Sequence, residues 1–140
     1  MTACVRYIVD DVDAAIEFYA ERLDFVVEMH PAPAFAEISR EDLHLYLSQP
    51  TEEGGGGAPT SSGERQAPGG WNRIHLVVDD LEAEIERLEA AGCGFRDDVV
   101  QGVGGKQVLL EDPSGNLVEL FQPNTDEYRA PGSGRDADPE

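Results

Sequence analysis

The sequence is poor in residues that build disulfide-rich or membrane proteins. It has only two cysteines, Cys4 and Cys93, in 140 residues. That is too few for a disulfide framework, and their separation fits no zinc-knuckle spacing. We therefore expect free thiols. No apolar run reaches the roughly 18 residues of a membrane helix, and Met1 is followed by no basic and apolar leader. These absences predict a cytoplasmic protein without a membrane partner.

Basic residues are scarce as well. Lys and Arg number 10 against 29 Asp and Glu, which gives a formal net charge of -19. Binding to nucleic acid needs clustered positive charge, so a nucleic-acid partner is not expected. Two catalytic signatures are also missing: the chain has no Gly-x-Ser-x-Gly elbow, and its glycine-rich segment 102–106 lacks P-loop spacing. The acidic surface can attract a cationic ligand, although solvated helix faces explain the charge more simply.

What the chain does contain is an internal repeat. The pattern Cys4–Glu17 recurs 69 residues later as Arg73–Glu86, each time as a strand followed by an amphipathic helix. Asp10 or Asp11 is the expected N-cap of the first helix, and further strand patterns follow in both copies. Each copy therefore reads as a βαβββ module. The first has strands at 4–9, 25–30, 34–40 and 42–49; the second has strands at 71–78, 95–99, 107–111 and 116–122 and a helix at 81–91.

The modules fill one expected domain, residues 1–123. Module one covers about 4–49, and module two covers about 71–123. Between them, 50–70 is rich in glycine, proline and small polar residues, a composition typical of a flexible linker. The tail, 124–140, is rich in Gly, Pro, Asp and Arg and is expected to be disordered.

Strand alternation assigns each side chain to a face. The apolar positions of the first and last strands of each module point to one side, where the helix packs. The first helix should bury the stripe Val12, Ala15, Ile16, Tyr19 and Leu23. The opposite face is half polar, which is typical of a solvated face or a ligand cavity. It carries Arg6, Tyr46, His75 and Glu119, with Phe121, Trp71 and Phe35 as possible aromatic walls. We expect the first four to line a single pocket, formed by the modules of one chain or by modules of two chains.

Two stretches, 9–19 and 110–123, together with the second strand and helix, resemble the vicinal oxygen chelate superfamily. This superfamily includes glyoxalase I, extradiol dioxygenases, fosfomycin resistance enzymes and bleomycin resistance proteins. The resemblance covers about residues 4–123. It implies an α+β fold in which two tandem βαβββ modules form curved mixed sheets around a concave cavity, with the helices outside.

The resemblance also implies where a metal would bind. His75 matches the first-strand ligand of the superfamily's metalloenzymes, and Glu119 matches the last-strand carboxylate. In module one, Arg6 and Tyr46 occupy the equivalent positions, and an arginine cannot coordinate a cation, while tyrosine is an uncommon ligand. Two ligands remain where such chemistry generally needs three.

Two other histidines are possible third ligands. His44 lies on the same face as Tyr46 but two positions away, and His30 ends a strand before Pro31. Without a third ligand, His75 and Glu119 would form a polar pair, with Arg6 bridging to Glu119.

Three functions remain open. The first is a binding protein, like the bleomycin resistance proteins, that sequesters a natural product or antibiotic without a metal or other cofactor. The alternative is a metal-dependent lyase or dioxygenase that uses His75 and Glu119 with zinc, iron, manganese or nickel. A third is a subunit whose cavity is vestigial and whose role is association. For the first, we expect a small-molecule ligand held by Arg6, Tyr46, His75, Glu119, Phe121 and Trp71, and a homodimer, as in the bleomycin resistance proteins.

Overall fold

The computed structural model describes residues 1–124. Apart from Asn124, the tail expected to be disordered therefore lies outside the described residues. The chain divides into two compact units. The first combines Met1–Asn72 with Glu111–Leu117, and the second contains Arg73–Leu110 and the chain from Val118 onward. Each sequence copy thus builds most of one unit, and the expectation that both form one domain stays a prediction.

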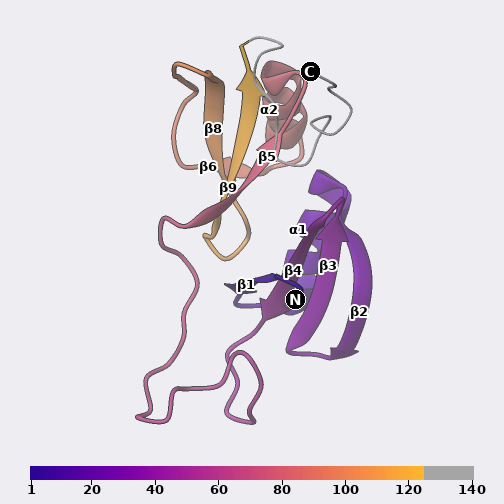
Figure 1. Ribbon diagram of the computed structural model, residues 1–140, viewed down its shortest axis with the longest axis vertical. Helices are drawn as coiled ribbons and strands as arrows, with labels where there is room; N and C mark the ends of the chain where they lie inside the picture. The colour runs from indigo at the N-terminus through magenta and orange to yellow at the C-terminus, as the bar shows by residue number, and fades with distance from the viewer. Residues whose placement is uncertain (125–140) are drawn as a thin grey trace. The chain divides into compact units, whose positions relative to one another are not determined.

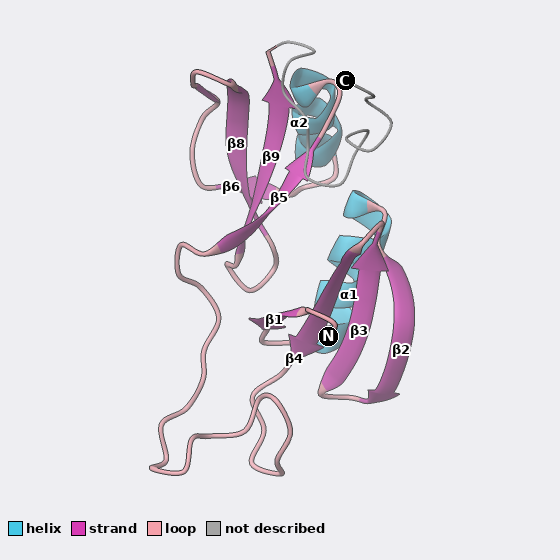
Figure 2. Ribbon diagram, viewed as in Figure 1, coloured by secondary structure: helices cyan, strands magenta, loops and turns pink. Residues whose placement is uncertain are grey.

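The first unit is a four-stranded mixed sheet with one helix. The strands β1 and β4 pair in parallel, and β3 pairs with β4 and β2 in antiparallel fashion, so the order is β1-β4-β3-β2. Figure 1 shows these strands side by side, and Figure 2 shows α1 on one face of the sheet. The elements are β1 (Val5–Ile8), α1 (Val12–Leu23), β2 (Val26–Ala32), β3 (Phe35–Arg40) and β4 (Leu43–Ser48).

Helix α1 begins and ends at residues suited to those positions. Asp11 is its N-cap and accepts a hydrogen bond from the backbone N–H of Ala14. Asp24 ends the helix in the left-handed conformation, with φ of 62°. The buried face is the expected stripe with one change: Phe18 is buried, whereas Ile16 is only half-buried. The side chains that α1 buries are Val12, Ala15, Phe18, Tyr19 and Leu23.

The second unit holds a five-stranded sheet and α2. The order is β5-β9-β8-β6, with β7 paired to β8. Its elements are β5 (Arg73–Val77), α2 (Leu81–Ala90), β6 (Gly94–Phe95), β7 (Val100–Gln101), β8 (Gly105–Glu111) and β9 (Leu117–Pro123). Two mixed sheets with one helix each confirm the predicted α+β class. Among residues 1–124, no helix is long and apolar enough to cross a membrane.

One predicted strand, 95–99, is wrong. Only Gly94–Phe95 is extended there, and a separate short strand follows at Val100–Gln101. Between them, the Asp97 carboxylate accepts a hydrogen bond from the backbone N–H of Asp98 at 2.8 Å. A local bond of this kind occupies a backbone donor that a strand would use in its ladder. Two consecutive aspartates therefore break the strand that the apolar pattern predicted.

Matching hydrogen bonds show that the two copies are structural repeats. The side-chain oxygen of Gln49 accepts from the backbone N–H of Val12 at 3.0 Å, at the start of α1. Gln122 does the same for Leu81 at 2.7 Å, at the start of α2. Asp80 caps α2 as Asp11 caps α1. Equivalent positions in the two units can therefore be compared directly.

The segment 50–70 has no helix or strand, as expected, but hydrogen bonds hold part of its backbone in place. The side-chain amide of Gln66 donates to the carbonyl oxygens of Gly56 and Ala58 at 2.9 and 2.8 Å. Gly57 is buried, and its carbonyl accepts from Thr51. The sequence indicated too few apolar groups to pack, but hydrogen bonds and close glycine contacts hold this part of the segment in place.

The turn between β8 and β9 closes within the first unit around a buried carboxylate. Asp112 is 4% exposed and accepts from the Tyr19 hydroxyl at 2.9 Å. It also accepts from the backbone N–H groups of Ser114 and Asn116, each at 2.9 Å, and from the Asn116 amide at 3.1 Å. The turn chemistry expected of this Asp-Pro-Ser-Gly-Asn stretch is therefore anchored to α1.

Candidate functional site

In the first unit, the predicted site residues lie on the sheet face opposite α1. Arg6 pairs with Tyr46 across β1 and β4, and Tyr46 pairs with Glu37 across β4 and β3. Their sequence neighbours Tyr7 and Leu45 are buried, because alternate strand residues point to opposite faces. The structure therefore places Arg6 and Tyr46 on one polar row, as strand alternation predicts.

The Arg6 side chain is held by its neighbours. Its Nη1 donates to the Ser48 hydroxyl at 2.7 Å, and its guanidinium carbon lies 5.2 Å from the centre of the Tyr46 ring. This is the arrangement of a cation over an aromatic face. Phe35 meets the same ring edge-on, at 5.4 Å between centroids. Arginine, two aromatic rings and a hydroxyl thus form one cluster on this face.

Tyr46 is electrostatically coupled to this cluster. Hydrogen bonding with the Cys4 thiol is the main cause that raises the pKa of Tyr46, and the Glu37 carboxylate adds to it. The Arg6 guanidinium acts in the opposite direction. The phenol therefore stays protonated at neutral pH, so that it can donate or accept a hydrogen bond.

In the second unit, Glu119 is the centre of the predicted site. It is only 8% exposed. One carboxylate oxygen accepts from Arg73 Nε at 3.0 Å, and the other lies 3.2 Å from His75 Nδ1. Both carboxylate oxygens thus have a nitrogen partner within the same unit, and one of these partners carries a permanent positive charge.

His75 is also in contact with an aromatic ring. Its ring centroid lies 5.0 Å from that of Phe121, with the planes tilted by 41°. Phe121 is buried, and the backbone of Gly105 packs so closely on it that a side-chain carbon there would lie 2.8 Å from the ring. His75 itself has a side chain that is 40% exposed. The structure therefore brings together three of the predicted residues: His75, Glu119 and Phe121.

Equivalent hydrogen bonds show which residues correspond between the units. Val9 donates to the carbonyl of Ser48, and Val78 donates to the carbonyl of Phe121. This correspondence matches Ser48 with Phe121 and, two residues earlier, Tyr46 with Glu119, as expected. Along the first strands, it matches Arg6 with His75 and Cys4 with Arg73.

Arg73 is a residue of this candidate site that sequence reasoning missed. It lies two positions before His75 on β5, so the alternation that assigns His75 to the polar face assigns Arg73 to it as well. The signal was therefore present in the strand pattern. Trp71, two residues earlier still, is 65% exposed and precedes β5.

The two other histidines each face a carboxylate. His44 Nδ1 lies 2.7 Å from a Glu37 carboxylate oxygen, on the same face as Tyr46. His30 Nε2 lies 3.9 Å from an Asp13 oxygen. Within residues 1–124, no three His, Cys, Asp or Glu side chains are grouped as they would need to be to hold a metal ion.

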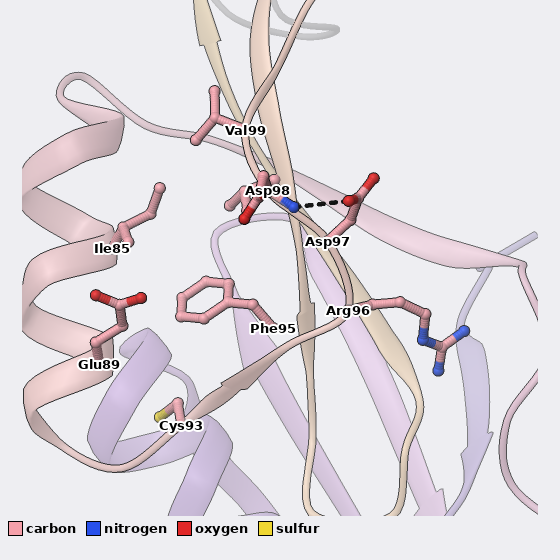
Figure 3. A pocket seen from close by; sticks show the side chains of 9 residues that line it. Ile85, Glu89, Cys93, Phe95, Arg96, Asp97, Asp98 and Val99 are labelled. Atoms are coloured by element: carbon pink, nitrogen blue, oxygen red, sulfur yellow. Dashed lines mark hydrogen bonds between the residues drawn. The ribbon is translucent and has the colours of Figure 1, made fainter.

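A cavity of about 550 Å³ lies elsewhere in the second unit, beside α2. In Figure 3, the side chains of Ile85 and Glu89 point from the helix toward the ring of Phe95, and Arg96 points away from them. The volume of this cavity is in the range of small-molecule pockets, roughly 300–1,000 Å³. No predicted site residue lines it, so it is separate from the polar sheet faces.

Comparisons with solved structures identify the fold. A lactoylglutathione lyase from Agrobacterium tumefaciens superposes with a TM-score of 0.66 at 22% identity, over 87% of this chain and 94% of that one. The antibiotic binding protein TnmS3 from Streptomyces sp. CB03234 gives 0.63 at 23% identity, over 89% and 98%. A glyoxalase/bleomycin resistance protein/dioxygenase from Nocardioides gives 0.66 at 18% identity, over 93% and 89%.

No curated protein matches the chain. The family comparison is positive. Residues 3–120 match the model of the Glyoxalase/Bleomycin resistance protein/Dioxygenase superfamily, and this range includes both repeats and all but one of the predicted site residues. The exception is Phe121, one position beyond the match. The chain therefore belongs to the glyoxalase/bleomycin resistance protein/dioxygenase superfamily.

Proposed function

We propose that this protein binds a small molecule, such as a natural product or antibiotic, and acts by sequestration without a catalytic metal. The observation that carries the proposal is the pairing of Glu119. The carboxylate that matches the superfamily's metal ligand is engaged by Arg73 and His75 at 3.0 and 3.2 Å. Its counterpart in the first unit is Tyr46, beside Arg6.

Electrostatics opposes a cation at this position. A divalent ion on Glu119 would lie close to the permanent charge of Arg73. Two unit charges 4 Å apart interact by about 4 kcal/mol at an effective dielectric constant of about 20. A metal would therefore have to displace the guanidinium, which would then need another partner.

The surroundings suit an organic ligand. Aromatic rings lie beside the polar groups in both units: Phe35 and Tyr46 beside Arg6, and Phe121 beside His75. Aromatic walls with a few placed polar groups are typical of small-molecule sites. An antibiotic binding protein with the same fold supports this reading. Arg6, Tyr46, His75, Glu119, Phe121 and Trp71 are the proposed ligand-binding residues.

Metal content tests the proposal. Protein purified without chelator should hold clearly less than about one tightly bound divalent ion per chain, since catalytic zinc sites typically use about three protein ligands. Glu119→Ala should change the affinity for aromatic natural products, followed through Trp71 fluorescence. Exposed Glu86 on α2 provides the control, because Glu86→Ala should leave the affinity unchanged. Stoichiometric zinc, iron, manganese or nickel that is lost in His75→Ala would contradict the proposal.

That last outcome would support the alternative, a metal-dependent lyase or dioxygenase. One observation favours it: His75 and Glu119 face each other at 3.2 Å, as two ligands of one ion would after a small rearrangement. A lactoylglutathione lyase also shares the fold. This is the second candidate because residues 1–124 group no third His, Cys, Asp or Glu with these two.

The assembly and location belong to the same proposal. Strand β2 is an edge strand with exposed Val26, Val27 and Met29, and exposed edges of this kind invite pairing with another chain. We propose a homodimer, the commonest symmetric assembly. Cys4 and Cys93 are both free thiols, which suits a reducing compartment such as the cytoplasm.

A further inference from the structure

Within the first unit, residues 1–72 and 111–117, the Arg6 guanidinium is a cation without a carboxylate partner. In this part of the chain its contacts are the Ser48 hydroxyl, the Tyr46 ring and the backbone of Gly56. Two other arginines are paired with carboxylates: Arg65 with Glu52, and Arg73 with Glu119. An arginine without such a partner stands out in a chain with 29 acidic and 10 basic residues.

The protein nevertheless orients this side chain. The bond to Ser48, a residue only 1% exposed, fixes one end of the guanidinium, and the Tyr46 ring supports it from below at 5.2 Å. A guanidinium has five N–H donors, of which Ser48 receives one. Several donors are therefore held in place without an acceptor in the first unit.

The glycine-rich loop packs against the same group. A side-chain carbon on Gly56 would lie 1.7 Å from Arg6 Nη1 and 2.3 Å from its central carbon, so only glycine allows the loop and the guanidinium to occupy these positions together. Gln66 holds the loop through the carbonyls of Gly56 and Ala58. The loop thus packs against the guanidinium at Gly56 but places none of its carboxylates in an ion pair with it.

We propose that Arg6 is the anion-recognition point of the ligand site. It would bind a carboxylate, sulfonate or phosphate group on an aromatic ligand, whose ring would pack beside Tyr46 and Phe35. Charge-assisted bonds from a guanidinium to such groups are short, strong and often bidentate. The inference rests on the proposed function and adds the charge of the ligand. The protein would select an anionic group through the guanidinium of Arg6, which its neighbours hold in one orientation.

Two fluorescent probes with the same rings test the charge. Anilinonaphthalene sulfonate carries an anionic group, and N-phenylnaphthylamine is its neutral counterpart. Wild-type protein should bind the sulfonate about tenfold more tightly or better, the range expected for a hydrogen bond to a charged group. Titration followed by probe fluorescence gives both dissociation constants.

Two variants then test the residue. Arg6→Gln should remove the preference for the sulfonate while leaving binding of the neutral probe nearly unchanged. Gly56→Ala should have the same effect, because the added methyl group displaces the flexible end of Arg6. The matched controls are Arg65→Gln, an exposed arginine already paired with Glu52, and Gly94→Ala, where an added carbon meets nothing within 4 Å. Both should keep the preference, and thermal unfolding should show that all four variants fold.

The outcomes separate the two proposals. If the neutral probe binds in saturable fashion and the sulfonate binds no more tightly, the small-molecule site stands and the role of Arg6 is overturned. Sulfonate binding that Arg6→Gln leaves unchanged overturns it as well. If neither probe binds, the proposed function is contradicted together with this inference.

Discussion

Removing the hydroxyl of Tyr19 tests whether the buried carboxylate of Asp112 holds the first unit together. Tyr19 is fully buried and donates to Asp112 at 2.9 Å. In Tyr19→Phe the ring and its packing against Phe18 and Phe25 remain, and only the hydrogen bond is lost. A hydrogen bond to a charged group is worth about 1.5–3 kcal/mol, and we expect a loss of stability in this range.

Tyr7→Phe is the matched control. Tyr7 is also a buried tyrosine of the first unit, but its hydroxyl donates to the neutral carbonyl of Leu117, at 2.8 Å. A neutral bond contributes only about 0.5–1.5 kcal/mol. Urea unfolding of both variants at neutral pH therefore should show Tyr19→Phe as the more destabilised. Equal losses, or a smaller loss for Tyr19→Phe, would refute the assignment of a charged acceptor.

The same pair predicts an alkaline dependence. Burial raises the pKa of Tyr19 well above its ordinary value, and the Asp112 carboxylate adds to the shift. Because the folded-state pKa is higher than the unfolded value of about 10, the folded state holds the proton more tightly. The free energy of unfolding that the protonated Tyr19 contributes is therefore fully present below about pH 10 and is lost as the pH rises from there toward the folded-state pKa. Wild-type protein should lose stability there more steeply than Tyr19→Phe, and parallel losses would contradict the coupling.

Three further predictions concern the helix caps, an exposed ion pair and the assembly. Gln49→Ala and Gln122→Ala should each lower the free energy of unfolding in urea by about 1 kcal/mol, because each leaves a backbone N–H at a helix N-terminus without its side-chain acceptor. Destabilisation by only one of the two substitutions would contradict the structural equivalence of the copies. The hydrogen bond from Lys106 lowers the pKa of Glu82, so Lys106→Gln should raise that pKa in an NMR titration, and an unchanged value would contradict it. Sedimentation at micromolar concentration should give twice the 15.2 kDa of one chain, and a monomer would exclude the dimer.

The sequence was a good guide to the fold because the fold depends on repeated local patterns. An offset of 69 residues relates two strand-helix pairs, and alternation separates Arg6 from its buried neighbour Tyr7. Both patterns follow from backbone geometry, so they hold wherever the strand is regular. They failed at residues 95–99, where Asp97 bonds to the next backbone N–H.

The partners of the site residues were harder to predict, since they depend on tertiary geometry. Strand alternation offered Arg6 as a partner of Glu119 or of an anionic part of a ligand, and the structure adds two partners of Glu119 from its own unit, Arg73 and His75. The approach of Gly56 to Arg6 joins residues 50 positions apart along the chain. No local sequence pattern predicts such a contact, because a glycine-rich composition indicates flexibility whether or not a glycine such as Gly56 packs against another residue.

The differences between the two repeats are the best indication of what the site does. The four positions occupied by Cys4, Arg6, Tyr46 and Ser48 in the first unit are occupied by Arg73, His75, Glu119 and Phe121 in the second. The second set neutralises itself, because its arginine and carboxylate pair. The first set keeps one guanidinium whose neighbours are uncharged or aromatic. The same backbone arrangement thus carries an arginine–carboxylate ion pair in the second unit and an arginine without a carboxylate partner in the first. A negatively charged group on a ligand would give Arg6 of the first unit the partner that Arg73 already has.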